Sequence, residues 1–531
     1  MMRKTTISLS LMAAMVVACP WYFLSAQETE EDSTDGEDLE IIDLEQEREV
    51  TRSPNEGVEG IEFDEATQSY RLVIDDSGDG DAEPLSERET QQNELQRLFD
   101  LYREALNNED YLEADTLAKR VVELSIRLNG LDSHDSAKAI TNLGIAQHKN
   151  RDYELALRNF MASIDIVERI DDNLSPGLIN PLQGLAATHA AVGRPDLARL
   201  AYQRAVHVSH VNEGPHNPDQ VDILASMAEL HISQGDFGEA IDIQERVFSI
   251  QARNIEPLSL EMIPPLERRA NWQHRLHQYH RERVTWRQII SILERHHGKK
   301  SLELLPPLTS LGNSFLFVSP TEYEYQPGVS PSSGETYMRR AYRIASEHPD
   351  ADWETVELSM LSLADYYVLS GRANRAAKVY EDTWKYLSEG DDPDRLRVRR
   401  DHLETVKVLQ KVAPPRYYNS ELRDDGRPPP DEFEQGIMSF NYVVSPSGRV
   451  VNVKHLETQP GQLINFDKVV ARALRRQIYR PRMKDGVVVA TGDVAYIHEF
   501  YYREADLPPA PATEAEPSAD DGDNPDGAAT E

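Results

Sequence analysis

The same order of side-chain sizes recurs every 42 residues through the middle of this chain. A large apolar residue opens each of six copies, at Leu98, Ile140, Leu182, Leu224, Leu266 and Leu308. Four positions later stand Tyr102, Gly144, Ala186, Ala228, Ala270 and Gly312, all small except the first. Residues four apart lie on one face of a helix, and a small residue there lets a neighbouring helix approach closely. Repetition at a fixed period therefore predicts a stacked repeat array.

A second helix completes each copy. Twelve residues after the second position of each copy, the first four copies have an alanine, at Ala114, Ala156, Ala198 and Ala240. The fifth copy has Glu282 at this place. The turn between the two helices contains Gly193, Gly235 and Gly371 in three of the copies. After a ten-residue insertion the register resumes as a seventh copy, with Met360, Ala364 and Ala376.

This order of a leucine, a small residue, a glycine turn, an alanine and an aromatic residue resembles the tetratricopeptide repeat. The resemblance covers residues 92–388. The usual period of that family is about 34 residues, so the longer period here adds roughly two helical turns, as in the branch that resembles kinesin light chain. The resemblance implies an all-α solenoid over residues 91–388, with about seven helical pairs.

The two ends of the chain differ from its middle in charge. Residues 27–90 carry 24 acidic and 4 basic side chains, and residues 504–531 carry nine acidic and no basic ones, out of a formal net charge of −36. Segments this polar bury too little apolar surface to offset chain entropy, so we expect both to be disordered, except for a hairpin over residues 61–74. The negative charge argues against nucleic acid as a partner.

The N-terminus indicates secretion. Basic residues precede an apolar run from Ile7 to Ala18, an order that predicts a signal peptide over residues 1–26. Two alternatives stay open: retention of residues 5–26 as a membrane anchor, and attachment of lipid at Cys19, the only cysteine. We expect contact with a membrane only through this segment, if it is uncleaved.

The pattern changes after the repeats. We expect a capping helix over residues 389–412, because terminal repeats need a polar outer face. A proline-rich linker over residues 413–435 should follow, since clustered prolines do not continue a helix. Residues 436–503 then show two alternating stretches around a Ser-Pro-Ser-Gly turn, a stretch of helical spacing and a last alternating stretch. This order predicts a hairpin, a helix and a strand.

Residues 436–503 resemble the TonB C-terminal domain. The resemblance rests on Phe466-Asp467, Tyr479-Arg480-Pro481, Gly486-Val487-Val488 and Phe500. The expected fold class is therefore α+β multidomain: an all-α tetratricopeptide-repeat solenoid followed by a small α+β domain. In that family the domain lies in the periplasm and pairs an edge strand with a short segment of an outer-membrane receptor. With the signal peptide, the resemblance implies a location in the periplasm of a Gram-negative bacterium.

The departures from TonB itself bear on function. In TonB itself, a membrane anchor that contains a histidine is followed by a spacer of Glu-Pro and Lys-Pro repeats. Here the first histidine is His134, outside the apolar segment, and the tetratricopeptide-like array stands in the place of the spacer. We therefore expect an envelope scaffold for protein–protein interaction. Its partners would be envelope proteins, including outer-membrane transporters or other members of transport complexes. The alternative is an energy-transducing component of outer-membrane transport, which requires residues 5–26 in the membrane.

The sequence shows no pattern typical of an enzyme, a metal site or a cofactor site. His274, His277 and His280 straddle the turn of the fifth repeat, where neither a helical face nor a cage brings them together. Residues 75–80 begin like a calcium loop, but its twelfth position is Ser86 rather than glutamate. Phosphate loops and nucleophile elbows are absent from the sequence. We expect a protein without catalytic residues, metal or cofactor.

The fifth repeat is a first candidate for partner binding because it is rich in basic residues. One hypothesis is a basic contact patch for an acidic partner, such as the chain's own acidic ends; the alternative is drift of one repeat, tolerated inside the array. The patch comprises Arg268, Arg269, Arg275, Arg281 and Arg283.

The last strand, predicted over residues 493–502, is the second candidate. Because it ends the domain, one of its edges is expected to lack a partner and to accept an extended segment of an envelope protein. The residues proposed for this contact are Val494, Tyr496, Ile497, His498, Phe500, Tyr501 and Tyr502.

Overall fold

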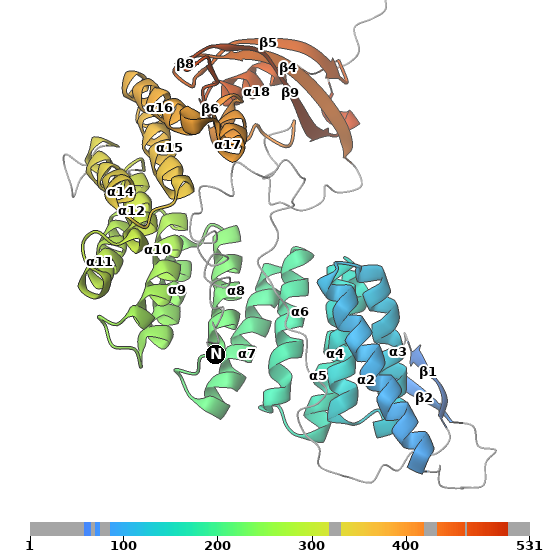
Figure 1. The fold of residues 1–531 in the computed structure, drawn as a ribbon. Coiled ribbons are helices and arrows are strands. Elements are labelled where there is room, and N and C mark those ends of the chain that lie inside the picture. Colours follow the sequence, from blue (N-terminus) through green and yellow to red (C-terminus); the bar gives the residue numbers. More distant parts are fainter. Residues whose placement is uncertain are drawn as a thin grey trace, which may run out of the picture. The chain divides into compact units, whose positions relative to one another are not determined.

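The computed structural model describes five stretches of the chain: residues 58–64, 69–74, 85–317, 331–418 and 433–507, without 462 and 464. These residues divide into two compact units, and the boundary falls between Ser362 and Leu363, inside helix α15 (Trp353–Leu369) (Figure 1). The signal peptide, most of the acidic segment, most of the linker and most of the acidic tail lie outside the described residues.

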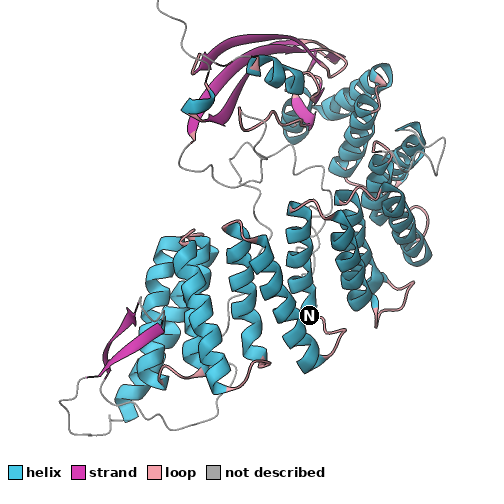
Figure 2. Ribbon diagram, turned by 180° about the vertical axis from the view of Figure 1, so that it is seen from behind, coloured by secondary structure: helices cyan, strands magenta, loops and turns pink. Residues whose placement is uncertain are grey.

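Helices follow one another in pairs through the first unit, as the ribbons in Figures 1 and 2 show. The pairs are α2 (Leu85–Asn107) with α3 (Tyr111–Asn129), α4 (His134–Lys149) with α5 (Tyr153–Ile170), α6 (Ile179–Ala191) with α7 (Pro195–Glu213), α8 (Gln220–Ser233) with α9 (Phe237–Ala252), α10 (Ile263–Arg275) with α11 (Tyr279–His297), and α12 (Leu305–Ser314) with α14 (Glu335–Glu347). The second helix of each of the first five pairs also contacts the first helix of the next. Helix α15 begins a seventh pair with α16 (Ala373–Ser388).

The 42-residue register coincides with the buried core. Residues of the first register position are at most 7 % exposed in all six copies, from Leu98 to Leu308. The alanines of the second helix, from Ala114 to Ala240, are fully buried. This burial confirms the repeat register and its assignment of helix-contacting faces.

Close helix approach is clearest around Phe160 of α5. Its ring is fully buried and lies against Gly144 of α4 and Gly184 of α6. A Cβ on Gly144 would come within 2.8 Å of the ring, and a Cβ on Gly184 would come closer still. The two glycines therefore make room for an aromatic ring between successive pairs.

We predict that Gly184→Ala lowers the free energy of unfolding by about 1–3 kcal/mol, because the added methyl group overpacks against Phe160. Gly238→Ala in α9 is the matched control, since a Cβ there meets only the Asp236 side chain, at 3.9 Å. Alanine should stabilise that helix by about 0.5–1 kcal/mol. Urea unfolding of both variants measures the difference, and equal stability of the two would contradict this packing.

The predicted hairpin near the N-terminus is present. Strand β1 (Val58–Asp64) pairs antiparallel with β2 (Ser69–Ile74). None of the described helices is both long and apolar enough to cross a membrane.

A three-stranded antiparallel sheet dominates the second unit (Figure 2). Its order is β5-β4-β9, formed by β5 (Val450–Gln459), β4 (Glu434–Val444) and β9 (Thr491–Tyr502). Helix α18 (Phe466–Leu474) covers one face through its buried apolar side. These elements match the hairpin, helix and last strand that the sequence predicts.

The boundary expected between capping helix and C-terminal domain differs from the structure. Helix α17 covers only Pro393–Leu403, and β3 (Lys407–Gln410) follows it and pairs antiparallel with β6 (Ile478–Arg480). The expected helix over residues 389–412 thus contains a strand that belongs to the C-terminal fold. Two further short strands, β7 (Met483–Lys484) and β8 (Val487–Val488), pair with each other.

Candidate partner-binding site

Two arginines of the fifth repeat converge on one carboxylate of the fourth. Arg269 of α10 donates to Glu245 of α9 over 2.7 Å, and Arg281 of α11 lies 3.8 Å from the same carboxylate. The Arg269 guanidinium also lies over the Phe248 ring, 4.3 Å from its centroid. Both positive charges therefore have an acidic neighbour in the preceding repeat.

Arg275 at the end of α10 makes a similar link. Both of its terminal nitrogens donate to the two carboxylate oxygens of Glu229 in α8, and its guanidinium lies 4.5 Å from the Trp272 ring. Arg268 is exposed. Three of the five arginines thus pair with acidic residues, which weakens the hypothesis of a basic patch for an acidic partner.

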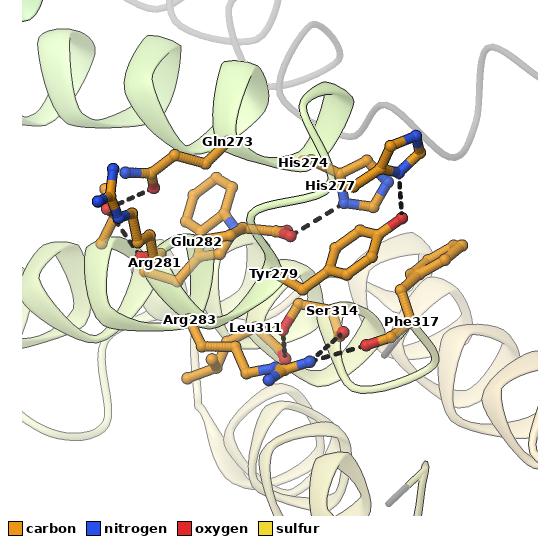
Figure 3. Close-up of polar contacts among 12 residues, drawn as sticks. Gln273, His274, His277, Tyr279, Arg281, Glu282, Arg283, Leu311, Ser314 and Phe317 are labelled. Carbon is orange, nitrogen blue, oxygen red and sulfur yellow. Dashed lines mark hydrogen bonds and ion pairs between the residues drawn. The ribbon is translucent and has the colours of Figure 1, made fainter. Parts of the chain in front are cut away.

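Arg283 is not a surface residue, which corrects its place in the predicted patch. Its side chain is 1 % exposed, and its Nη2 donates to the carbonyl of Phe317 over 2.7 Å and to that of Ser314 over 3.3 Å (Figure 3). Its guanidinium lies 4.7 Å from the Phe315 ring. The last turn of a helix leaves backbone carbonyls without hydrogen-bond donors. Arg283 therefore caps the C-terminal end of α12.

Glu282, where other copies have alanine, is buried and fully engaged. One carboxylate oxygen lies 3.0 Å from Nδ1 of His274 (Figure 3). The other accepts a hydrogen bond from Nε1 of Trp286 over 3.2 Å. Nδ1 of His277 instead contacts the Tyr279 hydroxyl at 2.7 Å. Within the described residues, no group of three or more His, Cys, Asp or Glu side chains is placed to hold a metal ion.

A half-buried histidine joins the second and third repeats. Nδ1 of His148 in α4 lies 2.9 Å from Oγ1 of Thr188 in α6, and that hydroxyl donates to the carbonyl of Gly184. The imidazole N–H is therefore the donor to Thr188. Burial, followed by the charge of Lys149, lowers the pKa of His148 to about 4.

This pKa makes stability depend on pH. The unfolded chain, with a histidine pKa near 6.5, takes up a proton between about pH 6.5 and 4 that the folded chain does not, so stability falls as the pH drops through this window. We predict that the parent loses about 2 kcal/mol more than His148→Gln between pH 7 and pH 4.5, by urea unfolding at both pH values. Parallel losses in the two proteins would rule out this role.

Strand β9 contributes two different faces to the second candidate site. One face turns toward α18 and carries Val494, Tyr496, His498, Phe500 and Tyr502. Of these, His498, Phe500 and Tyr502 are buried, so their side chains belong to the core rather than to a contact surface. Burial also lowers the pKa of His498. On the opposite face Ile497 is 65 % exposed and Tyr501 is half-buried.

The backbone of β9 has one edge directed away from β4. Tyr501 uses that edge: its N–H donates to the carbonyl of Arg416 over 2.8 Å, and its carbonyl accepts from Tyr418 over 2.9 Å. Because backbone groups alternate along a strand, those of Ala495, Ile497 and Glu499 point the same way. Among the described residues, these three have no backbone partner on that side.

A buried ion pair that the sequence analysis missed fixes the two-stranded β3–β6 sheet to the last repeat pair. Arg480 of β6, 7 % exposed, donates from Nε over 2.9 Å and from Nη2 over 2.5 Å to the carboxylate of Asp365 in α15. The Tyr380 hydroxyl donates to the same carboxylate over 2.6 Å, and Arg480 also donates to the carbonyl of His402. Burial holds the pKa of Tyr380 well above its usual value, so its hydroxyl remains a donor.

The repeat register contains a hint of this contact. Glu229 and Asp365 both stand five residues after the large apolar residue of their copies, Leu224 and Met360. Glu229 accepts from an arginine of the next repeat, whereas Asp365 accepts from Arg480 of β6. The same register position thus receives an arginine from the element that follows.

Comparison with known proteins agrees with the repeat register. A family model described as tetratricopeptide repeat matches residues 135–209 and residues 178–253. The chain contains tetratricopeptide repeats. Such repeats bind partner proteins, so this part of the chain suggests a scaffold for protein–protein interaction, a role that is typically non-catalytic.

Several solved structures are similar to parts of this chain, at low identity and low TM-score. The TPR-like repeats of a Podosopora anserina protein named for kinesin light chain are 17 % identical, with 38 % of this chain and 95 % of that chain covered and a TM-score of 0.33. BtubC (BKLC) from P. vanneervenii is 17 % identical, with coverages of 50 % and 95 % and a TM-score of 0.30. A signal-transduction ATPase with a tetratricopeptide repeat sensor from Pyrococcus horikoshii is 12 % identical, with coverages of 59 % and 45 % and a TM-score of 0.35. The search of curated proteins finds no match.

Proposed function

We propose that this protein is a periplasmic scaffold in which the tetratricopeptide repeats bind partner proteins and the C-terminal sheet captures an envelope protein by strand addition. The resemblance of residues 436–503 to the TonB C-terminal domain supports this proposal, and so does the order of hairpin, helix and edge strand. The signal-peptide pattern supports the location. The partners would be envelope proteins, among them outer-membrane transporters.

The observation that carries the proposal is the outer edge of β9. Ala495, Ile497 and Glu499 direct backbone donors and acceptors away from β4, and their side chains are exposed. An unpaired strand edge is a template for another strand. Main-chain hydrogen bonds would give affinity, and the exposed side chains would give specificity.

A proline at residue 497 tests this edge without disturbing the pairing with β4. Proline has no N–H, and edge positions tolerate it, so Ile497→Pro should remove one outward donor and abolish capture of envelope protein by the purified full chain. Ile497→Ala retains the N–H and should still capture the partner. The isolated fragment 431–505 is unsuitable, because it lacks β3 and the Asp365 that pairs with Arg480.

Circular dichroism and thermal unfolding of both variants establish whether each is folded before its capture of partner is compared. Equal capture by a folded Ile497→Pro variant and its parent would mean that strand addition at this edge is not the mode of binding. Fractionation of the native protein tests its location, and recovery only from the cytoplasm would overturn the periplasmic assignment.

A further inference from the structure

Part of the outer edge of β9 is already taken by the chain itself. Residues 415–418, here called the strap, follow β3 and lie parallel to β9, with Tyr417 opposite Tyr501. Two backbone hydrogen bonds join the strap to Tyr501, one from the Tyr501 N–H to Arg416 and one to the Tyr501 carbonyl from Tyr418. The strap therefore makes the type of contact that an added strand would make.

Side chains fix the strap in this position. Tyr417 is 6 % exposed, and its ring lies 5.4 Å from that of Phe433 and 5.9 Å from that of Tyr501. The ring nitrogen Nε2 of His498 lies 2.9 Å from the carbonyl oxygen of Pro415. Because a carbonyl oxygen only accepts, His498 donates its Nε2–H in this hydrogen bond. The buried face of β9 thus also contributes to holding the strap.

The strap cannot extend its full backbone pairing as far as Ile497. Continued in the same parallel register, the pairing would need an N–H from Pro414 to reach the Ile497 carbonyl, and proline has none. Among the described residues, the bridge between strap and strand joins Tyr417 to Tyr501.

Two backbone bonds join the strap to β9, beside the packing of Tyr417, the His498 contact with Pro415 and the Arg416 guanidinium 5.2 Å from the Tyr501 ring. A partner strand that pairs along the whole edge would make more backbone bonds than the strap does.

We propose that the strap is an internal competitor for the strand-binding edge of β9, so that a partner strand reaching Tyr501 binds only when the strap leaves. This proposal rests on the proposed function, because it assumes that a partner adds to the same edge. It assigns the strap an autoinhibitory contact, and it identifies Tyr417 as the anchor that keeps the contact closed.

The test uses the strap itself as the probe. A fluorescent peptide with the sequence of residues 411–418 is titrated onto the full chain, onto Tyr417→Asp and onto the control Lys411→Asp. Tyr417→Asp places a charge where a buried ring packs, and should release the internal strap, whereas Lys411 is exposed. We expect peptide binding to Tyr417→Asp at least tenfold tighter than to the parent or the control. Equal binding to all three, or binding to none, would overturn the proposal.

Amide hydrogen exchange of the unmodified chain gives an independent test that does not depend on a variant. The N–H of Tyr501 should be protected by the strap, whereas that of Ile497, on the same edge, should exchange at least tenfold faster. Equal, fast exchange at both amides would contradict the closed strap even if Tyr417→Asp fails to fold.

Capture of envelope protein separates this proposal from the function on which it rests. Increased capture by Tyr417→Asp supports both. If the peptide binds Tyr417→Asp but capture does not depend on Ile497, the strap inference holds and strand addition by a partner fails. If capture depends on Ile497 but strap release leaves it unchanged, the strap inference fails and the proposed function holds.

Discussion

Replacing Arg480 with alanine is expected to lower the free energy of unfolding of the C-terminal unit by about 3–5 kcal/mol, because it leaves the Asp365 carboxylate buried without its charge partner. The loss should be the largest produced by any single arginine of this unit. Arg480 donates to Asp365 through two nitrogens and to a carbonyl through a third, so no neighbour replaces it.

Chemical denaturation followed by near-ultraviolet circular dichroism measures this loss. Arg476→Ala is the matched control, because Arg476 is exposed just before β6 and surface substitutions usually change stability by less than about 0.5 kcal/mol. The double variant Asp365→Leu, Arg480→Leu should recover much of the stability, since an apolar pair has no charge to leave unpaired. A small effect of Arg480→Ala would mean that the β3–β6 sheet is not fixed to α15 in this way.

Ala228→Arg should produce the second large effect. Ala228 is fully buried in a core with Leu224 and Val247, so arginine would add volume and a charge where a helix approaches closely. Overpacking alone costs about 1–3 kcal/mol, and an unpaired buried charge adds several kcal/mol more. We expect a protein whose repeats unfold at a temperature well below that of the parent.

A substitution on the same helix provides the control for this result. Ser233 is exposed in the last turn of α8, where a positive charge interacts favourably with the helix dipole, so Ser233→Arg should unfold close to the parent temperature. Calorimetry of the two variants measures the contrast. Similar unfolding temperatures for Ala228→Arg and the parent would contradict the repeat register.

The repeats were predictable because their information is local. A large residue followed by a small one four positions later fixes which face of a helix meets its neighbour, and the burial of Leu266 and Ala270 follows the same rule as that of Leu182 and Ala186. The fixed period then extends the rule along the array. The hairpin, helix and last strand of the C-terminal sheet were predictable for a similar reason, from alternation and helical spacing.

The fate of individual charges was not predictable, because it depends on residues far away in the chain. Arg283 was placed on a surface patch, yet its partners are carbonyls 31 and 34 residues further on. Asp365 and Arg480 are 115 residues apart. Strand β3 lies within the helix expected over residues 389–412. Its four residues are too few to show the alternation with a period of two that identifies a strand.

The buried members of β9 show the limit of reading a strand from alternation alone. Alternation distinguishes two faces, but it does not say which one packs on a helix, and His498, Phe500 and Tyr502 proved to be core residues. It also does not reveal which edge of the strand is covered. The strap occupies part of that edge through Tyr417, in a segment expected to be only a linker.

The most direct test of the central claim is photocrosslinking from the edge of β9 in the protein's native cells. A photoreactive amino acid replaces Ile497, which is 65 % exposed on β9, or Leu456, which is 61 % exposed on β5 at the other side of the sheet. The proposed scaffold predicts crosslinks from position 497 to an envelope protein and few from position 456. Equal crosslinking from both positions, or crosslinks from 497 to cytoplasmic proteins alone, would contradict strand capture at this edge.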